Sequence, residues 1–339
     1  MGSYGLELKD LEELLVNMNE KKFRAKQIFH GIYRDFIDDF TELTTIKKDL
    51  AIKLNEVIPL KHFKLVKRQI SNDKTEKFLF ELDDHELIET VLMDHNYGLS
   101  LCVSSQVGCA MGCAFCASGL LGLKRSLTTE EIVNQVVEVS KITKKRISSI
   151  VVMGIGEPFT NYDNVMKFIR IINHDLGLAI GARHITVSTC GIVPKIYDYA
   201  YEGLQTNLAI SLHAPNDAIR DRIMKINHKY SINEVCKAVK DYIDITNRRV
   251  TIEYILLDGI NDSHENALEL AKLLKGLNVY INLIPYNSVN ENEFRRSKRI
   301  DEFFDDLKKQ GLNVTARKEQ GGDIDAACGQ LRSLNMHKK

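Results

Sequence analysis

Three cysteines lie close together in the segment SSQVGCAMGCAFCASG, residues 104–119. Cys109, Cys113 and Cys116 follow the spacing C-x3-C-x2-C, and Phe115 precedes the third. Structural zinc sites close their coordination with four ligands, often as two C-x2-C pairs, but the other four of the seven cysteines are scattered singly. Three thiolates can instead hold an iron–sulfur cube that keeps one iron open for a substrate. The spacing therefore favours a [4Fe–4S] cluster over structural zinc.

Glycine and polar residues follow several apolar runs of the sequence. The segment VVMGIGEPF carries Gly154, Gly156 and Glu157 directly after a β-branched run. The glycines would let a ligand approach the backbone, and the carboxylate can accept hydrogen bonds from an ammonium group. Two later runs, TVST and AISLHAP, end in further candidate ligand contacts: Ser188, Ser211, Leu212 and His213. Because a lone histidine is more often structural than catalytic, we expect this histidine to take part in binding only.

The elements that would position these residues follow from the hydrophobic periodicity. Residues 7–57 carry apolar side chains at spacings of three and four, which predicts helices, with Thr44 or Thr45 as the N-cap of the last one. From residue 62 the runs FKLVKRQI, EKFLFEL and HELIETVLM alternate and predict strands. After residue 98, seven short β-branched runs alternate with helical stretches, the first of which has Thr128 and Glu131 as its capping pair.

This alternation predicts an α/β fold in which helices cover a parallel sheet, with the site at the carboxyl ends of the strands of a partial or full βα barrel. We divide the chain into a helical domain at 1–60, a β-rich extension at 61–98, a barrel domain at 99–332 and a short basic tail at 333–339, expected to be disordered.

The composition indicates a cytosolic globular protein. The 339 residues include 46 basic and 46 acidic ones, so no overall charge points to a nucleic-acid partner. We find no signal peptide and no apolar run of membrane-spanning length, and we expect the thiols to be reduced. Basic clusters do occur at 21–26, 61–68, 144–146 and 294–299, where solvated faces and RNA contacts are both open interpretations.

The cysteine motif with its preceding aromatic resembles that of the radical S-adenosylmethionine (SAM) enzymes. The motifs CVSSQVGC, MGIGEP, HITVST, LAISLHAPND, TIEYILLDGIND, INLIPYN and GGDIDAACGQL together resemble the radical-SAM 23S ribosomal RNA adenine-C2 methyltransferases over residues 10–332. This resemblance implies a partial (β/α)6 radical SAM barrel whose free iron binds the amino and carboxylate groups of SAM. It implies SAM contacts at Gly156, Glu157, Ser188, Ser211, Leu212, His213 and Asn287.

The resemblance also implies how an electron-poor ring carbon is methylated. Cys328 matches the cysteine that SAM methylates first, and a second SAM generates a radical at that S-methyl group, which adds to C2 of adenine. Cys102 matches the cysteine that releases the product by forming a transient disulfide with Cys328. Glu89 matches the proposed proton acceptor. Cys190 stands where the family usually has serine, and we expect Cys190 and Cys236 to be packing residues.

The implied partners are 23S ribosomal RNA, transfer RNA as a second substrate, and an external flavodoxin-like electron donor. We expect the protein to act as a monomer and not to associate with a membrane. The helical domain and the basic clusters would bind RNA by its shape and phosphates, around a flipped base. Two alternatives stay open: a C8-specific enzyme of the sister family, and a non-catalytic iron–sulfur protein that binds RNA or senses redox state.

Overall fold

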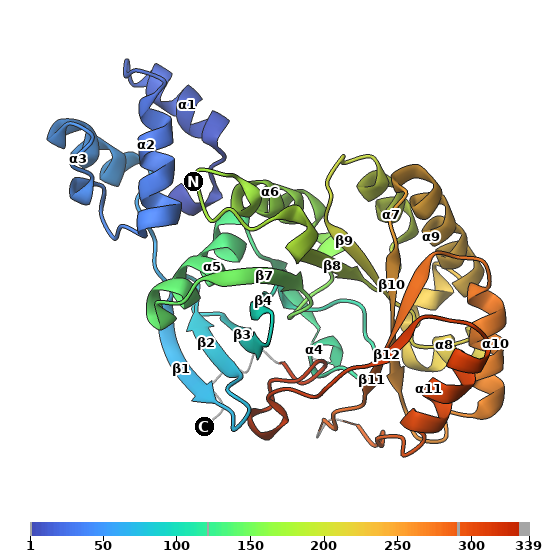
Figure 1. Cartoon of the computed structure of the whole chain (residues 1–339). Helices are drawn as coiled ribbons and strands as arrows, with labels where there is room; N and C mark the ends of the chain where they lie inside the picture. The colour runs from blue at the N-terminus through green and yellow to red at the C-terminus, as the bar shows by residue number, and fades with distance from the viewer. Residues whose placement is uncertain (1, 121, 290–291, 332–339) are drawn as a thin grey trace.

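The computed structural model describes residues 2–120, 122–289 and 292–331. A small helical unit at the N-terminus lies on one side of a larger unit of strands and helices (Figure 1). The tail that the sequence predicts to be disordered lies outside the described residues. Within those residues, no helix is both long and apolar enough to cross a membrane.

The N-terminal unit contains the helices α1 (Leu8–Asn17), α2 (Arg24–His30) and α3 (Lys48–Val57). The prediction that Thr44 or Thr45 caps the last helix is wrong, because α3 begins at Lys48 and its N-cap residue, Lys47, makes no side-chain cap. Both threonines lie in a turn that precedes Ile46, whose side chain is buried in the core. The chain therefore buries this isoleucine before it enters the helix.

The sheet has ten strands in the order β1-β2-β3-β4-β7-β8-β9-β10-β11-β12. The first three are antiparallel, and β3 pairs antiparallel with β4, so the β-rich extension is continuous with the barrel sheet. Neighbouring strands from β4 to β12 are parallel. The strands are β1 (Lys64–Ile70), β2 (Glu76–Glu81), β3 (Leu87–His95), β4 (Gly98–Cys102), β7 (Ile147–Val152), β8 (Ile185–Thr189), β9 (Asn207–Ser211), β10 (Val250–Leu256), β11 (Val279–Pro285) and β12 (Val314–Ala316).

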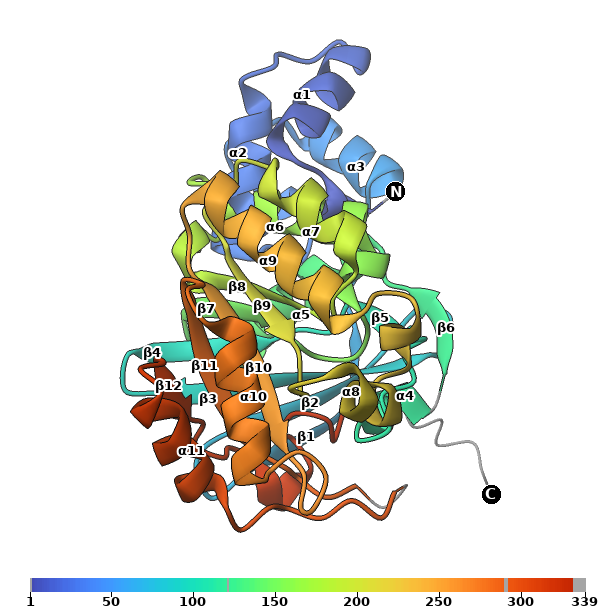
Figure 2. The same ribbon diagram turned by 90° about the vertical axis from the view of Figure 1, so that its right-hand side faces the viewer.

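The predicted partial barrel of six parallel strands is confirmed by β4, β7, β8, β9, β10 and β11, and β12 extends it by one short strand. Helices cover its outer surface (Figure 2). They are α5 (Thr129–Thr143), α6 (Tyr162–Asn173), α7 (Val193–Ala200), α8 (Asp217–Ile223), α9 (Ile232–Thr246), α10 (His264–Leu274) and α11 (Ile300–Lys309). The predicted capping of α5 is confirmed, since Thr128 and Glu131 cap each other's backbone N–H groups.

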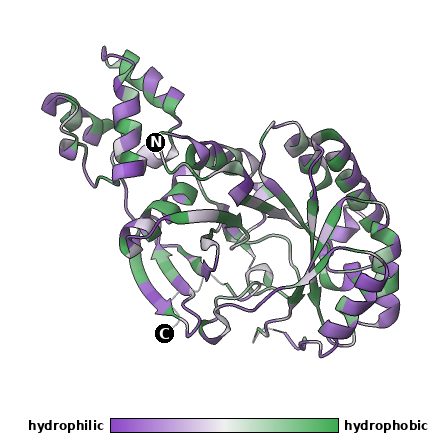
Figure 3. Cartoon of the chain, in the orientation of Figure 1, coloured by the Kyte–Doolittle hydropathy of each residue, from purple (hydrophilic) through white to green (hydrophobic). Residues whose placement is uncertain are grey.

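The main hydrophobic core lies between the sheet and these helices, and it continues into the N-terminal unit through buried side chains such as Tyr4, Leu11 and Phe29. Green apolar segments follow the strands, whereas purple segments lie on the outer helices (Figure 3). The backbone N–H of Gly2 donates to Glu130 of α5, 3.0 Å away, so the start of the chain is fixed to the barrel. The sheet and its extension together form the frame of the site.

Candidate active site

The three clustered cysteines lie on the loop that a small hairpin closes just after β4. Its strands are β5 (Gln106–Gly108) and β6 (Leu123–Ser126), which pair antiparallel. The N–H of Cys109 donates to the carbonyl of Gly122 at 3.0 Å. Gly108 has φ +74°, and a Cβ there would lie 1.9 Å from that same carbonyl oxygen, so this closure requires glycine.

Backbone hydrogen bonds connect the cysteine loop to two distant segments. The N–H of Ala114 donates to the carbonyl of Ile223, at the end of α8, over 2.9 Å. The N–H of Ala117, in the short helix α4 (Ala117–Leu120), donates to the carbonyl of Gly329 over 2.8 Å. The second bond joins the cysteine loop to the C-terminal loop that carries Cys328.

A cavity at the carboxyl ends of the strands brings most of the predicted binding residues together. Its lining includes Cys109, Cys113, Cys116, Gly156, Glu157, Ser188, Ser211, His213 and Cys328. Leu212 does not line it, since its side chain is buried in the main core and its backbone N–H donates to the carbonyl of Glu253. The sequence-based grouping therefore corresponds to one physical pocket with two exceptions, Leu212 and Asn287.

The thiols of this cavity suit a cluster of soft metal ions. Burial raises the pKa of Cys109 to about 12 and the pKa of Cys113 well above its ordinary value, and it also raises the pKa of Cys116. Such thiols stay protonated at neutral pH unless a cation stabilises the thiolates. In the described part of the chain, no three His, Cys, Asp or Glu side chains gather as ligands of a single metal ion would. Three soft donors around one cavity fit a [4Fe–4S] group held by thiolates.

Glu157 presents a buried carboxylate to the same cavity. Its Oε2 accepts a hydrogen bond from the N–H of Cys190 at 2.8 Å, and its Oε1 accepts one from the N–H of Phe159 at 3.0 Å. Burial raises the pKa of Glu157. Each carboxylate oxygen has further lone-pair capacity, so the side chain is fixed in place and can still accept hydrogen bonds from an ammonium group.

Gly154 and Gly156 have a more specific role than the sequence suggested. A Cβ on Gly154 would lie 2.7 Å from the carbonyl oxygen of Val103, and one on Gly156 would lie 2.7 Å from Ser105 Oγ. Gly156 also has φ +111°. The glycines therefore let the loop after β7 pack against the segment after β4, and both of them also line the cavity.

Polar groups at the ends of β8 and β9 complete this wall. Ser188 Oγ and Ser211 Oγ lie 3.3 Å apart. His213 Nδ1 accepts a hydrogen bond from the N–H of Ile255 at 3.0 Å, so the ring proton is on Nε2. Burial, assisted by the charge of Arg220, lowers the pKa of His213 to about 3. This histidine is therefore neutral at physiological pH, which suits binding rather than acid catalysis.

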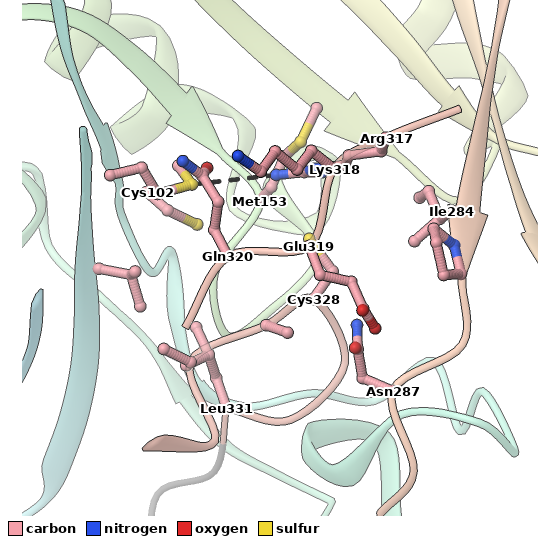
Figure 4. Close-up of a pocket in the computed structure, with 15 residues that line it drawn as sticks. Cys102, Met153, Ile284, Asn287, Arg317, Lys318, Glu319, Gln320, Cys328 and Leu331 are labelled. Atoms are coloured by element: carbon pink, nitrogen blue, oxygen red, sulfur yellow. Dashed lines mark hydrogen bonds between the residues drawn. The ribbon is translucent and has the colours of Figure 1, made fainter. Parts of the chain in front are cut away.

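A second cavity adjoins the first, and Cys102, Asn287 and Cys328 line it. Cys328 lies between the other two in the view of Figure 4 and contributes to both cavities. Burial, with a smaller contribution from Cys328, raises the pKa of Cys102 to about 12. Asn287 is thus placed beside the two isolated cysteines rather than in the lining of the cluster cavity.

Sequence reasoning missed Arg317, which follows β12 and lines both cavities. Interactions with Cys328 and then Glu253 raise the pKa of Arg317, and Arg317 in turn opposes the rise in the pKa of Cys102. Glu253 also lines the cluster cavity, where burial raises its pKa and Asn282 donates a hydrogen bond to it at 2.8 Å. Arg317 stands in the segment LNVTARK, the last of the seven short β-branched runs, whose pattern predicts only a strand.

Glu89 lies outside the lining of both cavities. It is buried on β3, and its Oε1 is 3.1 Å from Lys77 Nζ on β2. Cys190 is buried as expected, but it is more than a packing residue, because it lines the cluster cavity and its N–H binds Glu157. Cys236, on α9, packs against the main core as the sequence predicts.

Family models and relatives agree with this architecture. Residues 103–271 match the radical SAM superfamily, and residues 4–60 match the ribosomal RNA large subunit methyltransferase N-terminal domain. A protein of Acholeplasma laidlawii, named probable dual-specificity RNA methyltransferase RlmN, is 55% identical over 98% of this chain and 99% of its own length. A protein of the same name from Bacillus subtilis is 53% identical over 97% of this chain and 92% of its own length.

Among solved structures, a radical SAM methyltransferase from Sphaerobacter thermophilus is 44% identical and superposes with a TM-score of 0.94, covering 98% of this chain and 100% of the other. The similarity therefore extends over the helical unit, the β extension and the barrel alike.

Proposed function

Because the chain belongs to the RlmN family of radical SAM RNA methyltransferases, we propose that it methylates C2 of an adenosine in 23S ribosomal RNA, and in transfer RNA as well, with Cys328 as the methyl carrier. Membership of this superfamily implies a [4Fe–4S] cluster and SAM. The observation that carries the proposal is the place of Cys328, which lines both the cluster cavity and the adjoining cavity of Cys102.

The cluster cavity offers a separate set of groups for each cofactor. We assign Cys109, Cys113 and Cys116 to the cluster because they are the soft donors of one loop. We assign Glu157 to the SAM ammonium group, since its carboxylate is buried and already oriented by two backbone N–H groups. Gly156, Ser188, Ser211 and His213 complete the SAM wall. When bound, these cofactors supply the methyl group and a radical that abstracts hydrogen.

A carrier cysteine solves a chemical problem. C2 of adenine is electron-poor and cannot attack a methyl group directly, whereas a thiolate can. Cys328 can accept the methyl group while it faces the cluster cavity, and a carbon radical on that group can then add to the ring. Arg317 lines both cavities together with Cys328, and the interaction with Cys328 is the largest cause that raises the pKa of Arg317.

We assign product release to Cys102, which lines one cavity together with Cys328. Its thiolate attacks the sulfur of Cys328 and forms a disulfide, while the electron pair of the broken sulfur–carbon bond leaves with the methylene carbon, which takes up a proton to become the new methyl group. The C2 proton must leave before this step, together with one electron that the oxidised [4Fe–4S] group would take up when bound. We assign removal of the proton to Glu89, which is buried on the strand next to Cys102.

The test is to incubate the reconstituted enzyme with protein-free 23S ribosomal RNA, SAM and a low-potential reductant that stands in for a flavodoxin-like donor, and to analyse the nucleosides by mass spectrometry. We expect 2-methyladenosine. Methylation at C8 would assign the chain to the sister activity, and no methylation by protein with a full cluster would refute the proposal. We also propose that the protein is cytosolic and acts as a monomer. Equilibrium sedimentation can check the monomeric state.

A further inference from the structure

The loop that carries Cys328 is fixed to the turn between β1 and β2, far from it in sequence. The N–H of Gly321 donates to Asp73 Oδ2 at 2.9 Å. Asp323 accepts hydrogen bonds from Ser71 Oγ and from both the backbone and the side chain of Asn72. Two carboxylates, one on each segment, thus hold the C-terminal loop against the β extension.

Lys77 makes a further contact of a different kind, because it connects this loop to Glu89. Lys77 Nζ lies 3.1 Å from Glu89 Oε1 and donates a hydrogen bond to the carbonyl of Asp325 at 3.1 Å. Both side chains of the ion pair are only 8% exposed. A buried lysine therefore contacts at once the proposed proton acceptor and the backbone three residues before Cys328.

The strand geometry directs this ion pair toward the active site. Side chains alternate between the two faces of a strand, so Glu89, Val91 and Met93 share one face of β3. The last two of these line the cavity that contains Cys102 and Cys328. The next residue after Glu89, Thr90, points to the other face, where its hydroxyl donates to Gln135 of α5.

We propose that Lys77 is a positioning residue that keeps Glu89 ionised and holds it at a fixed distance from the loop of the methyl carrier. This inference rests on the proposed function and adds to it a residue to which the sequence motifs assigned no role. A carboxylate buried without a cation is protonated far more easily, and a protonated Glu89 could not accept the C2 proton. Because Lys77 also donates a hydrogen bond to the carbonyl of Asp325, the same ammonium group contacts both Glu89 and the loop that carries Cys328.

Other charged and titratable groups surround the pair. Cys102 lies on the neighbouring strand β4, Cys328 and Asp325 belong to the C-terminal loop, and Arg317 lines the cavity of Cys102 and Cys328. Arg317 interacts chiefly with Cys328 and Glu253, whereas Lys77 contacts Glu89 directly. Removing the ammonium group of Lys77 should therefore favour the protonated form of Glu89.

The experiment compares Lys77→Met with two matched variants. Asp323→Asn weakens the attachment of the same loop without touching Glu89, and Lys64→Met removes an exposed ion pair with Glu81 on the same hairpin. Methylation is measured under single-turnover conditions as a function of pH, and hydrogen exchange of residues 321–331 is measured by mass spectrometry. The exchange measurement does not depend on RNA methylation.

We expect Lys77→Met to lower the rate at neutral pH by about tenfold or more and to move the acid limb of the profile up by about one pH unit. Lys77→Arg, which keeps the positive charge, should return the acid limb of the pH profile to its wild-type position. Asp323→Asn should speed exchange of the loop and lower the rate equally at all pH values, and Lys64→Met should change neither property. If Lys77→Met keeps the wild-type shape of the profile, or resembles Asp323→Asn, the inference is wrong.

Two outcomes separate this inference from the proposed function and from misfolding. If the wild-type enzyme does not methylate RNA, the proposed function fails, while faster exchange in Lys77→Met would still support the loop contact. If Lys77→Met does not fold, Glu89→Gln replaces it, since the amide keeps the shape without the charge. Glu89→Gln should then show wild-type loop exchange and at least about a hundredfold loss of methylation, and wild-type activity would contradict the inference.

Discussion

Cys102, the last residue of β4, and Cys328, in the C-terminal loop, line one cavity although nearly the whole barrel separates them in sequence. Cys328 also lines the cluster cavity. Cys328 therefore borders both the cavity where a methyl group would be supplied and the cavity of Cys102, the thiol that would displace the product. This arrangement is required of a methyl carrier, and it leads to predictions about each participant.

The cluster loop can be tested by its metal content. Cys113→Ala should lose iron and the absorbance of an iron–sulfur cluster, because two thiolates alone leave the cube under-coordinated. Cys236→Ala is the matched control, since Cys236 packs on α9 away from the cavity. Iron analysis of anaerobically purified protein checks this prediction. Full iron content in Cys113→Ala would contradict our cluster assignment.

Methylation of Cys328 should be visible without any RNA. Protein expressed with its cluster should carry an extra methyl group on the peptide that contains Cys328, because Cys328 lines the cluster cavity together with the residues that we propose to bind SAM. Tandem mass spectrometry locates the group. Cys328→Ala should neither carry it nor methylate RNA, and RNA methylation by that variant would exclude the carrier mechanism.

The reactivity of Cys102 should depend steeply on pH. Burial raises the pKa of Cys102 to about 12, so below that value its thiolate fraction rises about tenfold per pH unit. Formation of the Cys102–Cys328 disulfide by oxidised glutathione, which is reduced to two thiols in the reaction, should therefore speed up as pH rises from 7 to 9. At any one pH, Arg317→Gln should slow formation of this disulfide, because the charge of Arg317 opposes the rise in the pKa of Cys102.

The matched control for that experiment is Lys318→Gln, which removes a neighbouring charge from the lining of the same cavity. It should leave the rate within about twofold of wild type, whereas Arg317→Gln should reduce it by about tenfold. Equal rates in the two variants would show that Arg317 does not act on the thiols. Peptide mapping under non-reducing conditions identifies the disulfide.

The loop after β7 should tolerate no side chain at Gly156. Its φ of +111° disfavours other residues, and a Cβ would lie 2.7 Å from Ser105 Oγ. Gly156→Ala should lower the free energy of unfolding by about 1–3 kcal/mol. Thermal denaturation measures this loss. Gly203→Ala is the control for backbone strain alone, since Gly203 has φ +69° with no atom within 4 Å of a Cβ. A Gly156→Ala protein no less stable than Gly203→Ala would refute the close approach.

Much of this fold can be predicted from periodicity, since the strands of the extension and of the barrel follow alternating or β-branched runs. Helix α11 could also have been predicted, because Ile300, Phe303, Phe304 and Leu307 have helical spacing. The strands of the β5–β6 hairpin, with three and four residues, are too short to give a pattern. The site residues that belong to sequence motifs can be identified from the sequence, and the chemical roles assigned to them stay predictions.

The contacts missed by the sequence analysis all depend on register or on long-range loop placement. Lys77 reaches Glu89 only because β2 and β3 pair Leu79 with Glu89, which sets the lysine diagonally opposite. Arg317 reaches the cavity because its N–H binds the carbonyl of Leu283 and turns the chain inward after β12. No local pattern contains this information.

The most direct test of the central claim uses Cys102→Ala with RNA labelled at its end. This variant keeps the cluster loop, the SAM wall and Cys328, and it lacks only the thiol that releases the product. After incubation with SAM and reductant, it should migrate on a denaturing gel with RNA covalently attached through Cys328, and the double variant with Cys328→Ala should migrate free of RNA. Normal turnover by Cys102→Ala, or the absence of attached RNA while the wild-type enzyme is active, would contradict the account.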